Sequence, residues 1–275
     1  MTLGVGAGAG AEGQLRFGKD QQLVVAAYNL DLDKVKALLA DGASPNARLG
    51  FYDEHLFEDK WESALSPSGS EQWTPLLATC SSPRAPQPTK RTENTLRALE
   101  AARTQRRRID PRLIRERDER RTAIVKELVS AKADLNLDDG HGATALAMSA
   151  GADEEIALLL IGAGADINTK ERIYIDGTFD QTPLHHATAK PNVLEAMLKR
   201  NAKLDAQDST GKTPLHWAVR RLNVASVKLL LNAGADPKVK DKSNRVPADL
   251  CGGSYADADS ARRETIRKML HEASD

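Results

Sequence analysis

Short apolar runs recur along the chain, and each is followed by a turn that contains Gly or Asn. The clearest runs lie at residues 156–161 and 227–231, where nearly every side chain is apolar. A helix that is apolar on almost all sides is buried among neighbouring elements. Gly42, Gly164, Gly234 and, once, Asn201 follow such runs at the place where a left-handed residue ends a helix. The pattern therefore predicts a succession of short, buried helices.

A six-residue motif, Thr-Pro-Leu-His-x-Ala, precedes two of these runs, at residues 182–187 and 213–218. Thr is a good N-cap, and Pro suits the first turn of a helix, so the motif predicts a further helix at each place. Because this motif is its signature, the chain resembles the ankyrin-repeat family. The resemblance implies an all-α solenoid of helix-turn-helix units joined by β-hairpin-type fingers. It also implies that His185 and His216 hydrogen-bond the backbone of an adjoining loop.

Six repeats can be traced, near residues 21–48, 72–138, 142–170, 180–207, 211–240 and 244–272. We expect them to form one ankyrin-repeat domain over residues 21–275, behind a disordered Gly/Ala-rich tail at residues 1–20. Thr182 and Thr213 stand 31 residues apart, close to the family period of about 33 residues, but Thr74 and Thr144 are 70 residues apart. The excess length predicts an insertion at residues 83–121, and two finger insertions are expected at residues 49–71 and 170–180.

The two finger insertions carry aromatic side chains and Arg, the residue types that most often anchor protein interfaces. The side chains in question are Phe51, Tyr52, Phe57, Trp61, Arg172, Tyr174 and Phe179. They are candidates for partner binding. The alternative is that the rings fold back and cover the repeat array.

The third insertion, residues 83–121, has 13 Arg and Lys against 6 Asp and Glu. Asp110 and Pro111 predict the start of a helix over residues 111–131. Three interpretations stay open: a solvated helical hairpin with pairs such as Arg112–Glu116 and Arg115–Glu119, a docking arm for an acidic protein, or contact with RNA or DNA. The last would use Arg103, Arg106, Arg107 and Arg108.

The resemblance also implies where an ordinary partner would bind, since ankyrin repeats use their hairpin tips and the concave face at the ends of the inner helices. These positions are small in the middle of the array and basic toward the C-terminal end. An acidic or extended, peptide-like partner would fit them. The candidates on this face are Tyr28, Lys190, Lys212, Arg220 and Arg221.

Charge and motif searches argue against other classes of function. The chain has 39 basic and 39 acidic residues, which gives no general attraction to nucleic acid or membranes. No stretch approaches the roughly 20 apolar residues that span a bilayer. Residues 8–13 match G-x-G-x-x-G but lack the surrounding βαβ unit, and no metal-ligand or nucleophile motif is present. We therefore expect no enzyme activity, no cofactor and no metal.

The sequence thus predicts a non-catalytic protein–protein interaction module that acts as an adaptor or a stoichiometric inhibitor. A nucleic-acid-associated adaptor that uses residues 83–121 is the alternative. We expect a monomer in the cytoplasm, although removal of a targeting peptide would leave a similar N-terminus.

Overall fold

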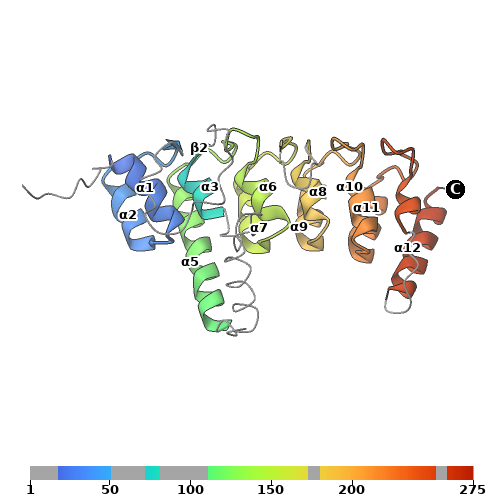
Figure 1. The fold of residues 1–275 in the computed structure, drawn as a ribbon. Coiled ribbons are helices and arrows are strands. Elements are labelled where there is room, and N and C mark those ends of the chain that lie inside the picture. Colours follow the sequence, from blue (N-terminus) through green and yellow to red (C-terminus); the bar gives the residue numbers. More distant parts are fainter. Residues whose placement is uncertain (1–17, 51–71, 81–110, 173–179, 252–258, 275) are drawn as a thin grey trace, which may run out of the picture.

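The computed structural model describes residues 18–50, 72–80, 111–172, 180–251 and 259–274. Its helices stand in pairs along a row (Figure 1). Inner helices contact the inner helices of the next pair, and outer helices contact outer ones. The inner helices are α1 (Lys19–Tyr28), α3 (Pro75–Cys80), α6 (Ala145–Ala150), α8 (Pro183–Ala187), α10 (Pro214–Arg220) and the 3-10 helix η1 (Pro247–Cys251). The outer helices are α2 (Leu32–Ala40), α5 (Pro111–Ser130), α7 (Glu154–Ala163), α9 (Pro191–Leu198), α11 (Val224–Asn232) and α12 (Ser260–Glu272). The predicted all-α solenoid is confirmed.

Antiparallel pairing joins successive pairs of helices at one edge of the row. Strands β1 (Leu49–Gly50) and β2 (Gln72–Trp73) place Leu49 opposite Trp73. Single bridges link Asp138 with Thr144 and Glu171 with Gln181 at the corresponding connections. These connections are β-hairpin-type, as the resemblance implied. Helix α1 begins at Lys19, so it includes the last two residues of the predicted tail.

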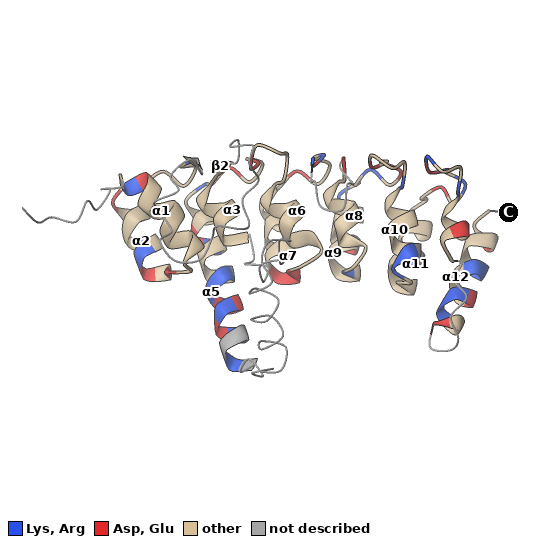
Figure 2. Cartoon of the chain, in the orientation of Figure 1, with Lys and Arg blue, Asp and Glu red and all other residues tan. Residues whose placement is uncertain are grey.

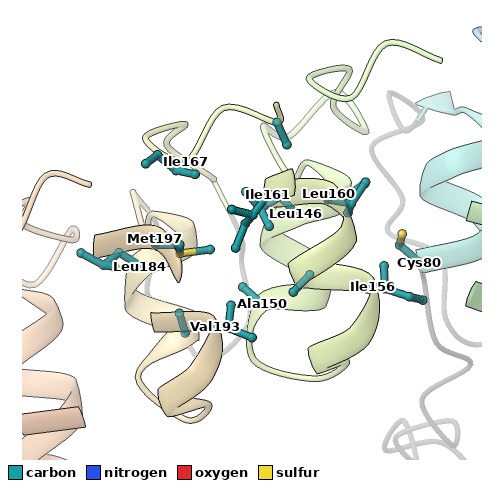
Figure 3. Packing of buried hydrophobic residues seen from close by; sticks show 14 of the residues in the cluster. Cys80, Leu146, Ala150, Ile156, Leu160, Ile161, Ile167, Leu184, Val193 and Met197 are labelled. Carbon is teal, nitrogen blue, oxygen red and sulfur yellow. The ribbon is translucent and has the colours of Figure 1, made fainter. Parts of the chain in front are cut away.

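Leucines at one position of the inner helices form the centre of the core. Each stands two residues after the residue that begins its repeat, and each is at most 2% exposed. Burying one such side chain contributes about 1.5–3 kcal/mol. Figure 3 shows how side chains of α6 to α9 fill the space between two adjacent pairs. Because each pair is buried by its neighbours, the repeats stabilise one another. The leucines are Leu23, Leu76, Leu146, Leu184 and Leu215.

The ends of the outer helices follow the predicted pattern. Gly42, Gly164 and Gly234 have φ of 79°, 99° and 94°, and Asn201 has 58°. The second repeat uses Lys132, at φ 62°, which the sequence pattern did not indicate. A left-handed residue at this place lets the backbone close the last turn of the helix.

Helix α5 extends beyond the array. It has 20 residues, twice the length of α7, and projects past the other outer helices (Figure 1). Its bounds confirm the helix predicted at residues 111–131. Arg121 is buried where α5 enters the array: its Nε donates to the Thr79 carbonyl (3.2 Å), and its Nη2 donates to the Cys80 carbonyl (3.1 Å). Arg121 Nη1 also pairs with Asp153 Oδ2 at 3.3 Å. This charge of the insertion therefore has a structural role.

Two glycines with positive φ allow a test of how tightly the hairpin tip at Gly211 is packed. Gly211 has φ 79°, and a Cβ there would lie 2.7 Å from the backbone nitrogen of Lys242; Gly234 has φ 94° with nothing within 4 Å. We expect Gly211→Ala to lower the free energy of unfolding by about 3 kcal/mol, because it adds a backbone clash to the left-handed strain. Gly234→Ala, the matched control, should cost about 1 kcal/mol from strain alone. Urea unfolding measures both, and equal costs would contradict the proposed close contact.

Candidate binding surface

The side chains of the repeated motif hold neighbouring repeats together. The Thr182 backbone N–H donates to His185 Nδ1 at 3.0 Å, so the ring proton sits on Nε2, which donates to the Lys212 carbonyl of the next repeat at 3.1 Å. Thr213 and His216 repeat this arrangement toward the Arg245 carbonyl, at 3.2 Å. Burial lowers the pKa of His185 to about 4 and also lowers that of His216. The structural role that the resemblance implied for both histidines is confirmed.

A second ladder of hydrogen bonds runs along the connections between repeats. At each step a side-chain oxygen accepts from a backbone N–H about one repeat further along the chain. These bonds fix how far each repeat is displaced from the next. The steps are Asn46 from Asp134 (2.7 Å), Asn136 from Asp166 (2.8 Å), Asn168 from Lys203 (2.9 Å) and Asp205 from Asp236 (3.1 Å).

Buried aspartates organise the hairpin tips. Asp208 Oδ1 accepts from the backbone N–H groups of Thr210 (2.8 Å) and Lys212 (3.0 Å), and its Oδ2 accepts from Trp217 Nε1 (2.8 Å). Burial by itself would raise the pKa of Asp208, but these hydrogen bonds bring the pKa below its ordinary value. One repeat later, Asp241 Oδ1 accepts hydrogen bonds in the same way from the backbone N–H groups of Ser243 and Arg245. The negative charges of both tips are therefore satisfied within the fold.

A row of varied side chains remains on the inner helices. It consists of the residue four places after the start of each repeat and of the residues at the end of each inner helix, and we call it the inner-helix face. Met148 and His186 in this row are half-buried. Its middle carries the small residues Gly151, Ala152 and Ala189, so few side-chain atoms project from the surface there. The hydrogen bonds of the motif histidines and the ladder along the connections hold the backbone beneath this row in place.

Two guanidinium groups lie over the Trp217 ring on this face. Arg220 Cζ is 5.1 Å and Arg221 Cζ 5.0 Å from the centre of the indole ring, within the range of a cation–π interaction. The Arg221 Nη1 also donates to the His185 carbonyl (3.1 Å) and to the Thr188 hydroxyl. We call Trp217, Arg220 and Arg221 the Arg–Trp–Arg cluster. The sequence pattern selects both arginines but does not single out Trp217, which occupies the variable position of the motif.

The other described candidates lie at four separate places. Tyr28 is half-buried beside Val24 and Leu49, so it packs on the array as well as bordering the face. Lys190 is half-buried at the N-cap of α9. Lys212 Nζ donates to the Thr210 hydroxyl (2.8 Å). Arg172 is exposed, and its backbone N–H donates to the His141 carbonyl at 2.7 Å.

The remaining candidates lie outside the described residues. They are Phe51, Tyr52, Phe57, Trp61, Tyr174, Phe179, Arg103, Arg106, Arg107 and Arg108. On the described part of α5, the ion pair at the projecting end joins Arg117 to the adjacent Asp118 (3.1 Å). Arg115 and Glu119, a pair considered from their spacing, form no ion pair within this described part.

His186 belongs to the inner-helix face but is tied to a buried carboxylate. Its Nε2 lies 3.1 Å from Oε2 of Glu171, whose side chain is fully buried. Burial raises the pKa of Glu171, while the hydrogen bond and charge of His186 act in the opposite direction. Residue spacing does not indicate this pair, because Glu171 and His186 lie on either side of a finger.

Other kinds of site find little support in the described ranges. Within them, no group of three or more His, Cys, Asp or Glu side chains is arranged to hold a metal ion. The described helices include none long and apolar enough to cross a membrane. Cys80 and Cys251 are buried free thiols, and burial raises the pKa of Cys80 to about 12, so its reactive thiolate form is suppressed.

The stacked pairs, the left-handed helix ends and the two hydrogen-bond ladders define a helical repeat protein. A family model for ankyrin repeats, in three copies, matches residues 155–241, from α7 to the tip that follows α11. The chain therefore contains ankyrin repeats, and the resemblance seen in the sequence is confirmed there. No curated protein compared with the chain matches it. Ankyrin repeats generally mediate protein–protein interaction and are typically non-catalytic.

Proposed function

We propose that the chain is a non-catalytic module that binds a partner protein through its inner-helix face, as an adaptor or a stoichiometric inhibitor. The observation that carries this proposal is that some side chains form hydrogen bonds within the array, whereas others on the same inner helices are exposed. The motif residues Thr182 and His185, and Asp208 at a hairpin tip, use their polar groups in hydrogen bonds within the array. On the inner-helix face beside them, Ala152, Ala189 and Arg220 are exposed and therefore accessible to a partner.

The face is well suited to binding because its backbone is fixed before a partner arrives. Inner helices α8 and α10 are bonded to the next hairpin through His185 and His216. Four side-chain bonds link successive connections. A surface that is already ordered loses little conformational entropy on association, which favours affinity. The finger residues at positions 51–71 and 173–179 remain part of the proposal as additional contacts.

Nucleic-acid binding through residues 83–121 is the alternative function. In the described part of that segment, exposed Arg112, Arg115, Arg117 and Arg120 stand among three acidic residues of α5, and Arg121 is buried. The exposed charge of this part is therefore close to balanced. A phosphate backbone is held by clustered, unbalanced positive charge, so the described part of α5 favours the protein-binding function.

Adding bulk to the low middle of the face tests the proposed function. Ala189 is exposed at the end of α8, and Ala225 is exposed on the outer helix α11. In affinity capture from native lysate, we expect Ala189→Arg to reduce the recovered partner protein about tenfold, the effect of losing roughly 1.4 kcal/mol of binding. Ala225→Arg, the matched control, should capture as much as the unchanged chain.

A third variant tests the first finger. It lacks residues 52–70 but keeps β1 and β2, since Leu49 is buried and paired with Trp73. Loss of the partner with this variant alone would assign binding to the finger. A partner retained by both Ala189→Arg and the finger variant would refute the inner-helix face. If nuclease treatment removes the captured material, and neither Ala189→Arg nor the finger deletion does, the result would support the alternative function.

A further inference from the structure

We propose that the Arg–Trp–Arg cluster anchors an acidic segment of the partner protein by binding its Asp or Glu carboxylates. This inference rests on the proposed function and names the chemistry of the partner. It follows from three observations: a guanidinium over the Trp217 ring whose donors no described residue uses, positive charge that forms no ion pair with a described acid, and a basic edge that continues the cluster.

Arg220 is the binding group of the cluster. Its guanidinium is exposed and rests on the indole of Trp217, and it forms no hydrogen bond or ion pair with any described residue. Stacking of this kind orients the planar group while its edge N–H donors remain available. A carboxylate matches two such donors at once, in a bidentate pair.

The charge of the cluster is not neutralised by its surroundings. The acid nearest to the ring, Asp208, is buried and accepts four hydrogen bonds from Thr210, Lys212 and Trp217. Arg221 brings a second positive charge close to the same ring, and its position is fixed by the His185 carbonyl and the Thr188 hydroxyl. Two exposed cations therefore lie beside one ring, and a negative ligand would relieve their repulsion.

The basic character continues from the cluster along the neighbouring hairpin edge. Residues 200–245 have ten Lys and Arg against four Asp and Glu. Blue side-chain positions gather at this end of the upper edge, whereas red positions are more frequent toward α6 (Figure 2). Four exposed lysines here take part in no ion pair with the described residues. They are Lys203, Lys238, Lys240 and Lys242.

The geometry favours an acidic polypeptide over a nucleic acid. Single-stranded nucleic acids are held largely by stacking of bases on exposed aromatic faces. Trp217 is only 8% exposed, and arginines lie over it, so it offers no free face to a base. Separate guanidinium and ammonium groups spaced along an edge suit carboxylates on an extended chain.

Fluorescence anisotropy with the full chain tests the inference. The probe is a fluorescein-labelled peptide of alternating Glu and Gly, compared with a Gln-Gly peptide and a thymidine oligonucleotide of equal charge. We expect the Glu peptide to bind, and Arg220→Gln to weaken that binding about fivefold to tenfold through loss of a charge-assisted pair. The control is Lys228→Gln, which removes the same charge from the exposed side of α11 in the same repeat. It should leave the affinity nearly unchanged.

Other outcomes would overturn the inference in distinguishable ways. Equal weakening by Arg220→Gln and Lys228→Gln would show general attraction instead of a site at the cluster. Failure of the Glu peptide to bind at millimolar concentration would refute an acidic partner. The proposed function would then still stand if Ala189→Arg loses the captured protein. Tighter binding of the oligonucleotide than of the Glu peptide would change the class of partner to nucleic acid.

Discussion

An Arg121→Ala variant is expected to lose about 3 kcal/mol of free energy of unfolding, a large share of the stability of an ordinary domain. Arg121 is 5% exposed and joins three elements: it caps the carbonyls of Thr79 and Cys80 at the end of α3 and pairs with Asp153 before α7. Its removal leaves buried carbonyl groups without donors, and each such group carries a desolvation penalty. Removing the Arg121 side chain would also break contacts that hold α5 to α3 and to the start of α7, at the place where α5 enters the array.

Urea unfolding followed by circular dichroism measures this effect. The matched control is Arg120→Ala, the exposed neighbour on the same helix, which should change stability by less than about 0.5 kcal/mol. Arg121→Lys keeps the charge but cannot reach both carbonyls and Asp153 at once, so we expect an intermediate loss. Equal stability of the Arg120→Ala and Arg121→Ala proteins would show that the buried contacts of Arg121 contribute nothing.

Acid is expected to begin to destabilise the array near pH 6.5, above the range in which ordinary carboxylates titrate. The pKa of His185 is lowered by burial from 6.5 to about 4 in the folded protein. The unfolded chain therefore takes up a proton at a pH where the folded chain does not. Stability is fully present above pH 6.5 and is lost as the pH falls toward about 4, by on the order of 3 kcal/mol from this residue. His216, whose pKa is also lowered, adds to the loss.

Other buried groups affect different parts of the pH profile. The raised pKa of Glu171 means that its folded form gains stability as the pH falls, which offsets part of the histidine effect. The lowered pKa values of Asp208 and Asp241 cause a further loss as the pH falls below 3.8. The loss that begins near pH 6.5 therefore belongs to the motif histidines.

Urea unfolding at a series of pH values between 7 and 4 measures the histidine contribution. A His185→Gln variant should be less stable at pH 7, because it loses the bond to Lys212, but its stability should fall less between pH 6.5 and 4. His271→Gln, on the exposed surface of α12, serves as the control and should keep the unchanged profile. If His185→Gln loses as much stability as the unchanged chain over this range, buried His185 is not the acid-sensitive group.

Both predictions concern the scaffold, yet they bear on binding. Arg121 and the motif histidines hold neighbouring repeats in one register, and the inner-helix face is continuous only in that register. A change that loosens one repeat should therefore weaken binding without touching a partner. Binding measurements on Ala189→Arg and Arg220→Gln need the unfolding curves of the same variants beside them.

Local and periodic chemistry made part of this protein predictable from its residues alone. The capping residues Thr182 and Thr213, the leucines two places later and the Gly or Asn helix ends keep their positions within a repeat, so they could be predicted; the left-handed Lys132 could not. The role of the motif histidines followed from the family resemblance. A solenoid repeats the same nearest-neighbour contacts, and this is why short-range patterns were sufficient.

The hydrogen-bond partners of individual polar side chains became clear from the three-dimensional fold. Arg121 looked like one charge of a basic insertion, but its partners lie more than 30 residues away in both directions. Arg220 and Arg221 are adjacent in sequence, yet Arg221 is bonded to the preceding repeat, whereas no described residue uses the donors of Arg220. The Glu171–His186 pair and the bond from Trp217 to Asp208 also depend on contacts with the connections between repeats. Such contacts are set by the three-dimensional offset between neighbours, which residue spacing along the chain does not specify.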